Sequence, residues 1–166
     1  MALFPPAPGG GQEVDYGYKG KGVLLHLLVD KNGHAVAIAT TGAKGNEKQQ
    51  VKGLLNQLPS RTLKGRIVVL EADKGYDAGW LRQALLNIGI FPLIPYRKIV
   101  GRCAPDFKEV CHFFRLTPQR WIVERAFAWL KRWCRRLLLR WERLVMIWSG
   151  FATLGIIYTW LKNLFG

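Results

Sequence analysis

The chain has 166 residues, of which nearly half are apolar and seven are tryptophan, so it is long and apolar enough for one folded domain with a core, and it is not a disordered tail. Its 25 Lys and Arg against 11 Asp and Glu leave a net charge of +14. An excess of this size favours a polyanionic partner, with nucleic acid ahead of an anionic membrane surface.

The N-terminal third is expected to end in a hairpin. Residues 1–22 are rich in proline and glycine, which predicts an extended or loop segment with no regular element. Residues 23–30 and 35–40 are both β-prone and flank an Asn-Gly turn, a strong hairpin pattern. Asp30 is then a turn carboxylate, and His26 and His34 are interpreted as structural.

A parallel strand pair is expected next. Residues 47–58 read as a helix, and residues 66–72 form the clearest strand of the chain, short and rich in β-branched residues, as in a strand buried on both faces. A turn at 73–77 opens a helix that runs to about Asn87, and residues 91–96 form another strand. A strand, a helix and a strand at this spacing predict a parallel pair with a crossover helix.

The C-terminal part, residues 119–165, is expected to be helical after a basic connecting loop at 97–118. A long helix starts near Arg120 and breaks near Trp141. Wound at 3.6 residues per turn, it separates into three stripes. The apolar stripe is Val123, Ala126, Phe127, Leu130, Cys134 and Leu137, the far basic stripe is Arg125, Arg132, Arg136 and Arg143, and the border between them is Arg120, Glu124, Lys131 and Arg135.

Glu124 therefore lies between the core and a positive surface, where a metal-binding acid would serve a polyanionic substrate. The alternative is a docked helix whose glutamate forms salt bridges with neighbouring arginines. Trp121, Trp129 and Trp133 favour packing over base stacking at this helical spacing.

Two other features have ordinary interpretations. Residues 144–161 carry no charge and have the length of a membrane span, but their polar and glycine residues favour a helix that is buried in a core or covers a sheet. Three cysteines without a Cys-x-x-Cys pair, Cys103, Cys111 and Cys134, favour reduced, buried thiols in a cytosolic protein over a zinc site or a disulfide framework. The opening residues do not read as a secretory signal.

The chemistry centres on Asp73, which directly follows the predicted buried strand, at the end where α/β sheets bind their ligands. If the helix with Glu124 packs across the same sheet edge, the two carboxylates can share a pair of divalent ions, for which Mg²⁺ is well suited. The alternative for Asp73 is a helix N-cap, and Asp77 is read as a cap or loop acid. The cations expected to contact phosphates are Arg120, Lys131, Arg132, Arg135 and Arg136.

Two separated motifs resemble a known family. Residues 72–77 (ADKGYD), together with 89–97 (GIFPLIPYR), resemble the second-aspartate region of bacterial insertion-sequence transposases of the DDE class. Residues 120–131 (RWIVERAFAWLK) resemble their glutamate helix, with the spacing of Arg120, Glu124 and Lys131 kept, although Thr117 stands where some members have tyrosine.

The resemblance implies an α/β fold of the RNase H-like class, in which helices flank a mixed sheet. It also implies a site with two Mg²⁺ ions and catalysis of DNA strand cleavage and transfer. Asp73 and Glu124 would be catalytic metal ligands. The partners would be terminal inverted repeats and target DNA, with a homodimer left open, no membrane, and a location on the nucleoid in the bacterial cytoplasm.

One departure limits the implied activity. In the family, the first catalytic aspartate ends the first central strand, and that position falls at about Met1, where no aspartate stands. Asp15 and Asp30 lie in a loop and a turn and are not expected to substitute. We therefore expect residues 1–166 to be a single catalytic domain that lacks its first strand (1–22 a loop, 23–96 the sheet and crossover helices). It would be inactive unless an upstream transposase segment supplies the missing aspartate. The alternative is an inactive DNA-binding remnant.

Overall fold

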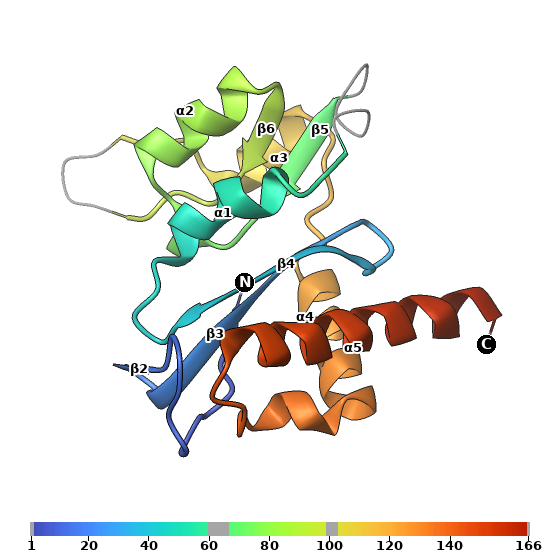
Figure 1. Ribbon diagram of the computed structural model, residues 1–166. Coiled ribbons are helices and arrows are strands. Elements are labelled where there is room, and N and C mark those ends of the chain that lie inside the picture. Colours follow the sequence, from blue (N-terminus) through green and yellow to red (C-terminus); the bar gives the residue numbers. More distant parts are fainter. Residues whose placement is uncertain (1, 60–66, 99–102, 166) are drawn as a thin grey trace. The chain divides into compact units, whose positions relative to one another are not determined.

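The computed structural model describes residues 2–59, 67–98 and 103–165, which form helices and short sheets (Figure 1). The chain divides into two compact units, Met1–Leu58 with Trp121–Gly166, and Pro59–Arg120. Together they confirm the predicted mixed α/β class.

The first unit contains an antiparallel sheet around one long strand. This central strand, β3 (Gly20–Val29), pairs with β1 (Ala2–Leu3), β2 (Asp15–Gly17) and β4 (Ala35–Gly42). The prediction that residues 1–22 hold no element is therefore wrong. The glycines that suggested a loop instead allow close packing in the sheet.

At Gly22, for example, an added Cβ would lie 2.5 Å from the carbonyl oxygen of Pro5. Only glycine lets the N-terminal segment approach β3 this closely.

The predicted hairpin is confirmed. β3 and β4 pair in an antiparallel register that places Leu27 opposite Ile38. In the turn, Oδ1 of Asp30 accepts hydrogen bonds from the backbone N–H groups of Asn32 and His34, each at 2.9 Å. Gly33 has a φ of +92°, a conformation that favours glycine, so the Asn-Gly pair sets the turn.

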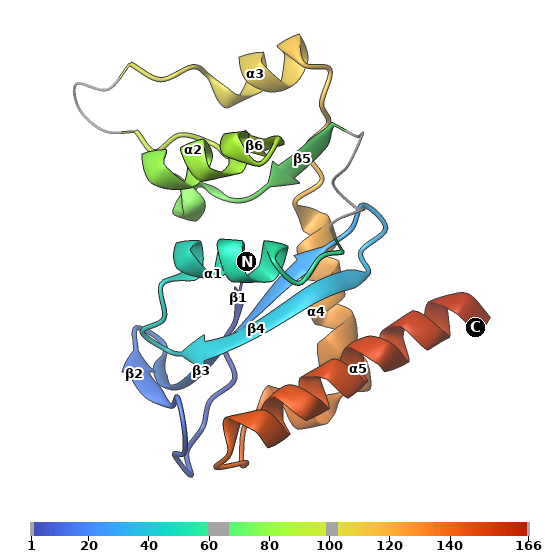
Figure 2. The same ribbon diagram turned by 45° about the horizontal axis from the view of Figure 1, so that its top comes forward.

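Helices cover both faces of this sheet. α1 (Glu47–Leu55) lies on one face, and α4 (Trp121–Trp133) and α5 (Val145–Phe165) lie on the other (Figures 1 and 2). The larger core lies between β3 and the α4–α5 pair, because alternate β3 side chains point to that face. Its buried members are Val23, Leu25, Leu27, Ala35, Phe127, Leu130, Leu137, Trp148 and Ala152.

The long C-terminal helix breaks earlier than predicted. α4 ends at Trp133, Cys134 leaves the helical region at φ −119° and ψ 69°, and a 3₁₀ helix, η3 (Arg135–Leu138), follows. The break lets Leu137 enter the core, where it is fully buried, and lets the chain return so that α5 packs on α4. The helical wheel placed Arg135 and Arg136 on the faces of one continuous helix. Because the helix breaks at Cys134, they do not continue the faces of α4.

α5 covers part of the sheet with one face. Trp148, Ala152 and Gly155 are buried, and the indole N–H of Trp160 donates to the carbonyl of Ala35 at the start of β4. This agrees with the predicted sheet-covering helix only in part, because most of the other side chains of α5 are at least partly exposed. By length and composition, α5 is also apolar enough to cross a membrane.

The second unit contains the predicted parallel pair. β5 (Val68–Glu71) and β6 (Ile90–Leu93) run parallel with Val68 opposite Ile90, and the crossover helix α2 (Gly79–Asn87) packs on β6. The start of the predicted strand, residue 66, lies outside the described residues. β5 is less buried than predicted, and Leu70 is its one buried residue. This lower burial follows because β6 is its only partner among the described strands.

The prediction of a loop over residues 97–118 is wrong in its second half, where α3 (Phe107–Phe113) forms. Asp106 caps this helix by accepting from the backbone N–H of Lys108 at 2.7 Å, and Glu109 occupies its first turn. Asp-x-x-Glu is a recognised helix-start pattern, so the sequence did contain the signal. After α3, the backbone N–H of Gln119 donates to a carboxylate oxygen of Glu71 at 2.7 Å and anchors the segment on β5.

Candidate functional site

Asp73 stands directly beyond β5, at the carboxyl end of a parallel strand. Its backbone is extended and its side chain caps a short 3₁₀ turn, η2 (Lys74–Tyr76), in which Oδ1 accepts from the backbone N–H of Gly75 at 2.6 Å. The capping alternative is therefore correct for η2, while α2 begins after Ala78 without a side-chain cap. In the described part of the chain, Oδ2 of Asp73 has no hydrogen bond, so one oxygen is left for a metal ion.

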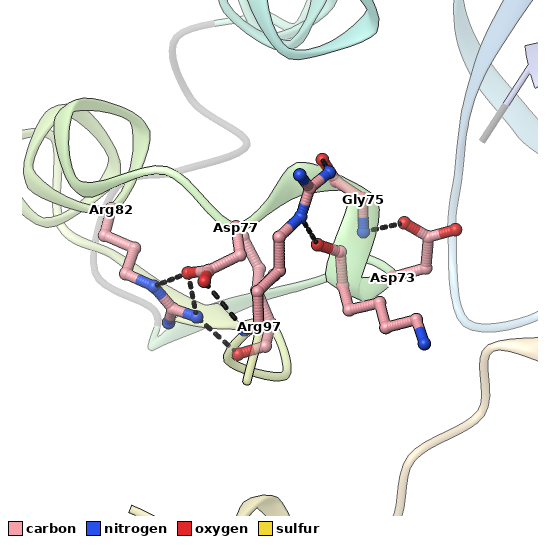
Figure 3. Close-up of polar contacts among 7 residues, drawn as sticks. Asp73, Gly75, Asp77, Arg82 and Arg97 are labelled. Atoms are coloured by element: carbon pink, nitrogen blue, oxygen red, sulfur yellow. Dashed lines mark hydrogen bonds and ion pairs between the residues drawn. The ribbon is translucent and has the colours of Figure 1, made fainter. Parts of the chain in front are cut away.

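Asp77 is a structural carboxylate, as predicted. It is buried, and its Oδ1 accepts from Nε of Arg82 at 3.0 Å, while its Oδ2 accepts from the backbone N–H of Arg97 at 2.9 Å (Figure 3). Arg82 also donates to the carbonyl of Ile94 and stacks on the ring of Tyr96, with 3.8 Å between its Cζ and the ring centroid. These contacts tie the turn after β5 to the segment after β6.

Glu124 lies in the first turn of α4 and is exposed. Its negative charge is favourable there, because the N-terminal end of a helix carries a partial positive charge. The alternative interpretation placed Glu124 in salt bridges with neighbouring arginines. Among the residues that the structure describes, Glu124 has no ion pair.

Four of the five predicted phosphate-binding cations are exposed and unpaired within the described ranges. Lys131 and Arg132 lie near the C-terminal end of α4, Arg135 lies in η3, and Arg120 lies one residue before α4. Arg132 stacks on Trp133, whose ring centroid lies 5.1 Å from the guanidinium carbon. Lys131, Arg132 and Arg135 leave their charge available to solvent, and they are called the basic segment below.

Arg136 differs from the other predicted cations because it is paired. Its Nη2 lies 2.6 Å from Oε1 of Glu142, and its Nε donates to the same oxygen at 2.8 Å. The Glu142 side chain is almost fully buried, and its Oε2 accepts from the backbone N–H of Trp141. Arg136 therefore supports the connection between η3 and α5.

Arg125 was expected on the far basic stripe, but it holds the hairpin instead. Its guanidinium lies between the rings of Trp121 and Trp129, at 4.6 and 4.9 Å from their centroids, and donates to the carbonyl of Asn32 at 2.7 Å. Only the tertiary structure brings the hairpin to α4, so the sequence alone gave no signal for this role. Trp121 and Trp133 are 55 % and 40 % exposed, so the packing interpretation holds only in part for them.

The cysteines also depart in part from the prediction. Cys111 is buried, and burial raises the pKa of its thiol, as it does for the half-buried Cys134. Cys103 is exposed instead of buried.

The two predicted metal ligands, Asp73 and Glu124, offer carboxylate oxygens, which are the hard ligands that Mg²⁺ prefers. Each has an oxygen that is not committed to another described group. They come from different units, Asp73 from the second and Glu124 from the first. Across the described residues, no group of three or more His, Cys, Asp or Glu side chains is arranged to hold a metal ion.

Comparison with known proteins places these features in a family. Residues 5–160 match the family described as the transposase DDE domain. A relative from Burkholderia cepacia, assigned as the transposase for insertion sequence element IS402, is 37 % identical over 135 residues. The match covers 78 % of this chain and 58 % of the relative, so the chain spans little more than half of that protein's length. No solved structure matches the chain.

Proposed function

Since this chain belongs to the family of transposases with a DDE domain, we propose that it is part of an RNase H-like catalytic domain that cleaves and transfers DNA strands. Asp73 and Glu124 are its metal ligands in this proposal. The family generally uses divalent metal ions, and Mg²⁺ suits a site built from few carboxylates and several waters. The substrates are the terminal inverted repeats of an insertion sequence and the target DNA.

The position of Asp73 carries the proposal. It is the first residue past Ala72 at the carboxyl end of a parallel strand, the edge where open α/β sheets bind ligands. One of its oxygens is held by the N–H of Gly75, which leaves the other for a cation. A pair of bound divalent ions would activate a water or a 3′-hydroxyl and stabilise the leaving oxygen of a phosphodiester.

The basic segment supplies the rest of the substrate contact. Lys131, Arg132 and Arg135 present positive charge on the same unit as Glu124, where they can neutralise DNA phosphates. Arg120, exposed just before α4, is assigned the same role. Arg136 is assigned a smaller one, because Glu142 already neutralises it.

Two open strand edges support the proposal that a further segment completes the site. On the edge of β3 opposite β4, β1 reaches only to the pair of Ala2 with His26, so Leu27 to Val29 have no partner there among the described strands. Among the strands that the structure describes, β5 likewise pairs with β6 alone. Unpaired edges are unfavourable in a finished sheet. We propose that a strand preceding β1 pairs with an open edge of this kind, ends in the first aspartate and supplies the third carboxylate.

The second candidate function is a DNA-binding remnant without catalysis. It is favoured by one observation, namely that no three metal-binding side chains gather in the described part of the chain. In this case, the basic segment still binds duplex DNA, but no cleavage follows.

The test is a nicking and strand-transfer assay on duplexes that carry the terminal inverted repeats, with Mg²⁺ or with chelator. It compares the 166-residue chain with the same chain fused to an upstream polypeptide segment that forms a β-strand ending in aspartate. We expect no product from the chain alone and Mg²⁺-dependent product from the fusion. Asp73→Asn and Glu124→Gln in the fusion should each abolish the product.

Three outcomes would change the assignment. Product from the unfused chain, lost on Asp73→Asn, would contradict the need for an added segment. A fusion that binds DNA without cleaving it would favour the remnant. Product that survives Asp73→Asn would remove Asp73 from the site.

A further inference from the structure

The turn that carries Asp73 is held from outside by one side chain. Arg97 donates from Nε to the carbonyl oxygen of Lys74 at 2.9 Å and from Nη2 to the carbonyl oxygen of Gly75 at 3.0 Å (Figure 3). Both carbonyls belong to η2, the turn that Asp73 caps. All four residues lie in the second unit.

The first of these bonds acts on the peptide that holds the carboxylate. The carbonyl of Lys74 and the N–H of Gly75 belong to the same peptide group, which is planar and rigid. Arg97 binds this peptide at its oxygen, while Oδ1 of Asp73 binds it at its nitrogen. Fixing the plane of this peptide therefore fixes the direction of the Asp73 carboxylate. The charged donor also polarises the peptide and strengthens the hydrogen bond from the Gly75 N–H to Asp73.

Arg97 is itself fixed at its backbone. Its N–H donates to Oδ2 of Asp77 at 2.9 Å, and Asp77 is held on its other oxygen by Arg82. Arg82 in turn donates to the carbonyl of Ile94 at 2.6 Å. The guanidinium thus reaches the turn from a rigid base, although Arg97 as a whole residue is exposed.

We infer that Arg97 is a positioning residue for Asp73, setting the direction of its free oxygen toward a divalent cation. This inference rests on the proposed function, in which Asp73 is a metal ligand. Arg97 does not contact the metal ion in this arrangement. It acts through the peptide between Lys74 and Gly75.

A purely electrostatic role for Arg97 predicts the opposite effect. A positive charge near Asp73 repels a divalent cation, so removing it would tighten metal binding. Loss of positioning would weaken metal binding instead. Arg97→Lys separates the two further, because it keeps the charge but cannot make two donations in fixed geometry.

The experiment uses the ¹⁵N-labelled 166-residue chain and two NMR measurements. The first is the exchange rate of the Gly75 amide with water. The second is the Mn²⁺ concentration that half-broadens the Asp73 and Gly75 resonances. The variants are Arg97→Ala and Arg97→Lys, and the control is Lys98→Ala, which removes the neighbouring exposed charge.

In both Arg97 variants, we expect Gly75 exchange to rise about tenfold, the factor that corresponds to one lost hydrogen bond. We expect the half-broadening Mn²⁺ concentration to rise severalfold, while Lys98→Ala leaves Gly75 exchange unchanged. Unchanged Gly75 exchange in Arg97→Ala, or tighter Mn²⁺ binding by it, would overturn the inference.

The metal role of Asp73 is tested separately by Asp73→Asn. If the unsubstituted chain shows no Mn²⁺ effect at Asp73, or if the effect survives Asp73→Asn, the proposed metal role fails. Gly75 exchange then still decides whether Arg97 orders the turn, and a failed metal role also overturns the inference that this order serves a cation.

Discussion

Arg82 and Asp77 form a salt bridge in the second unit, with 3.0 Å between Nη2 and Oδ1 and with both side chains largely buried. The pair joins α2 to the turn that follows β5. Asp77 also accepts from the backbone N–H of Arg97, which joins the same turn to the segment after β6. A buried ion pair of this kind fixes geometry more than it adds net stability.

Removing one partner of this pair should be costly. Asp77→Ala leaves the Arg82 guanidinium without its counter-ion in a largely buried position, which costs about 3–5 kcal/mol of unfolding free energy for such pairs. The measurement is amide hydrogen exchange at Leu81 and Leu85, the buried residues of α2. As a control, Gln83→Ala removes only an exposed hydrogen bond to Asn87 and should change exchange little. Equal effects of the two substitutions would contradict the assigned role of Asp77.

His26 should make the stability of the first unit depend on pH. It is buried in β3, its Nε2 pairs with the hydroxyl of Thr41 at 2.8 Å, and burial lowers its pKa from 6.5 to about 4. Between these values, the unfolded chain binds the proton and the folded chain does not. As the pH falls from about 6.5 toward 4, protonation of His26 in the unfolded chain therefore lowers the free energy of unfolding, whereas above about pH 6.5 His26 causes no such loss.

The expected loss is about 3.5 kcal/mol, by the conversion of 1.4 kcal/mol for each pH unit between the two pKa values. Urea unfolding at pH 4.5, 5.5 and 7 measures it, with His26→Gln as the comparison. The variant should lose the part of the pH slope that lies between 4 and 6.5. If both proteins keep the same slope, His26 is not its source.

Two glycines of α5 offer a matched pair for the packing of α5 on α4. At Gly155, an added Cβ would lie 2.9 Å from Sγ of Cys134 and 3.4 Å from Cδ2 of Leu130, whereas at Gly150 nothing lies within 4 Å. We expect Gly155→Ala to destabilise by about 1–3 kcal/mol, as overpacking typically does. Gly150→Ala should stabilise by about 0.5–1 kcal/mol through its better helix propensity. Thermal unfolding compares the two, and a stabilising Gly155→Ala would show that α5 does not pack closely there.

The predicted DNA-binding cations should not contribute equally. Lys131 is exposed and unpaired within the described residues, whereas Arg136 is neutralised by Glu142. If both face DNA, Lys131→Ala should weaken duplex binding and reduce the slope of log affinity against log salt by about 1, the effect of one lost phosphate contact. Arg136→Ala should change that slope less. Fluorescence anisotropy over a salt series measures both, and a larger change for Arg136→Ala would show that its pair with Glu142 opens on DNA.

Much of the local structure could be predicted from the sequence, because it depends on neighbours in the chain. The Asn-Gly turn between β3 and β4 and the strand–helix–strand order around α2 were correct, since turn geometry and the handedness of crossovers are local rules. The carboxylate of Asp73 at the end of β5 was found for the same reason. The capping pattern at Asp106 was present too, and its helix was missed because the surrounding residues resembled a loop.

The tertiary structure decided which charged side chains are engaged and which are available. Three arginines lie at positions that the sequence predicts to be exposed, yet each donates hydrogen bonds within the fold. Arg125 donates to the carbonyl of Asn32, Arg136 to the carboxylate of Glu142, and Arg97 to the carbonyls of η2. Their partners lie 93, 6 and 23 residues away, so only chain folding selects them. A sequence pattern determines which face of a helix is polar. Whether a cation on that face stays free depends on what the rest of the chain brings against it.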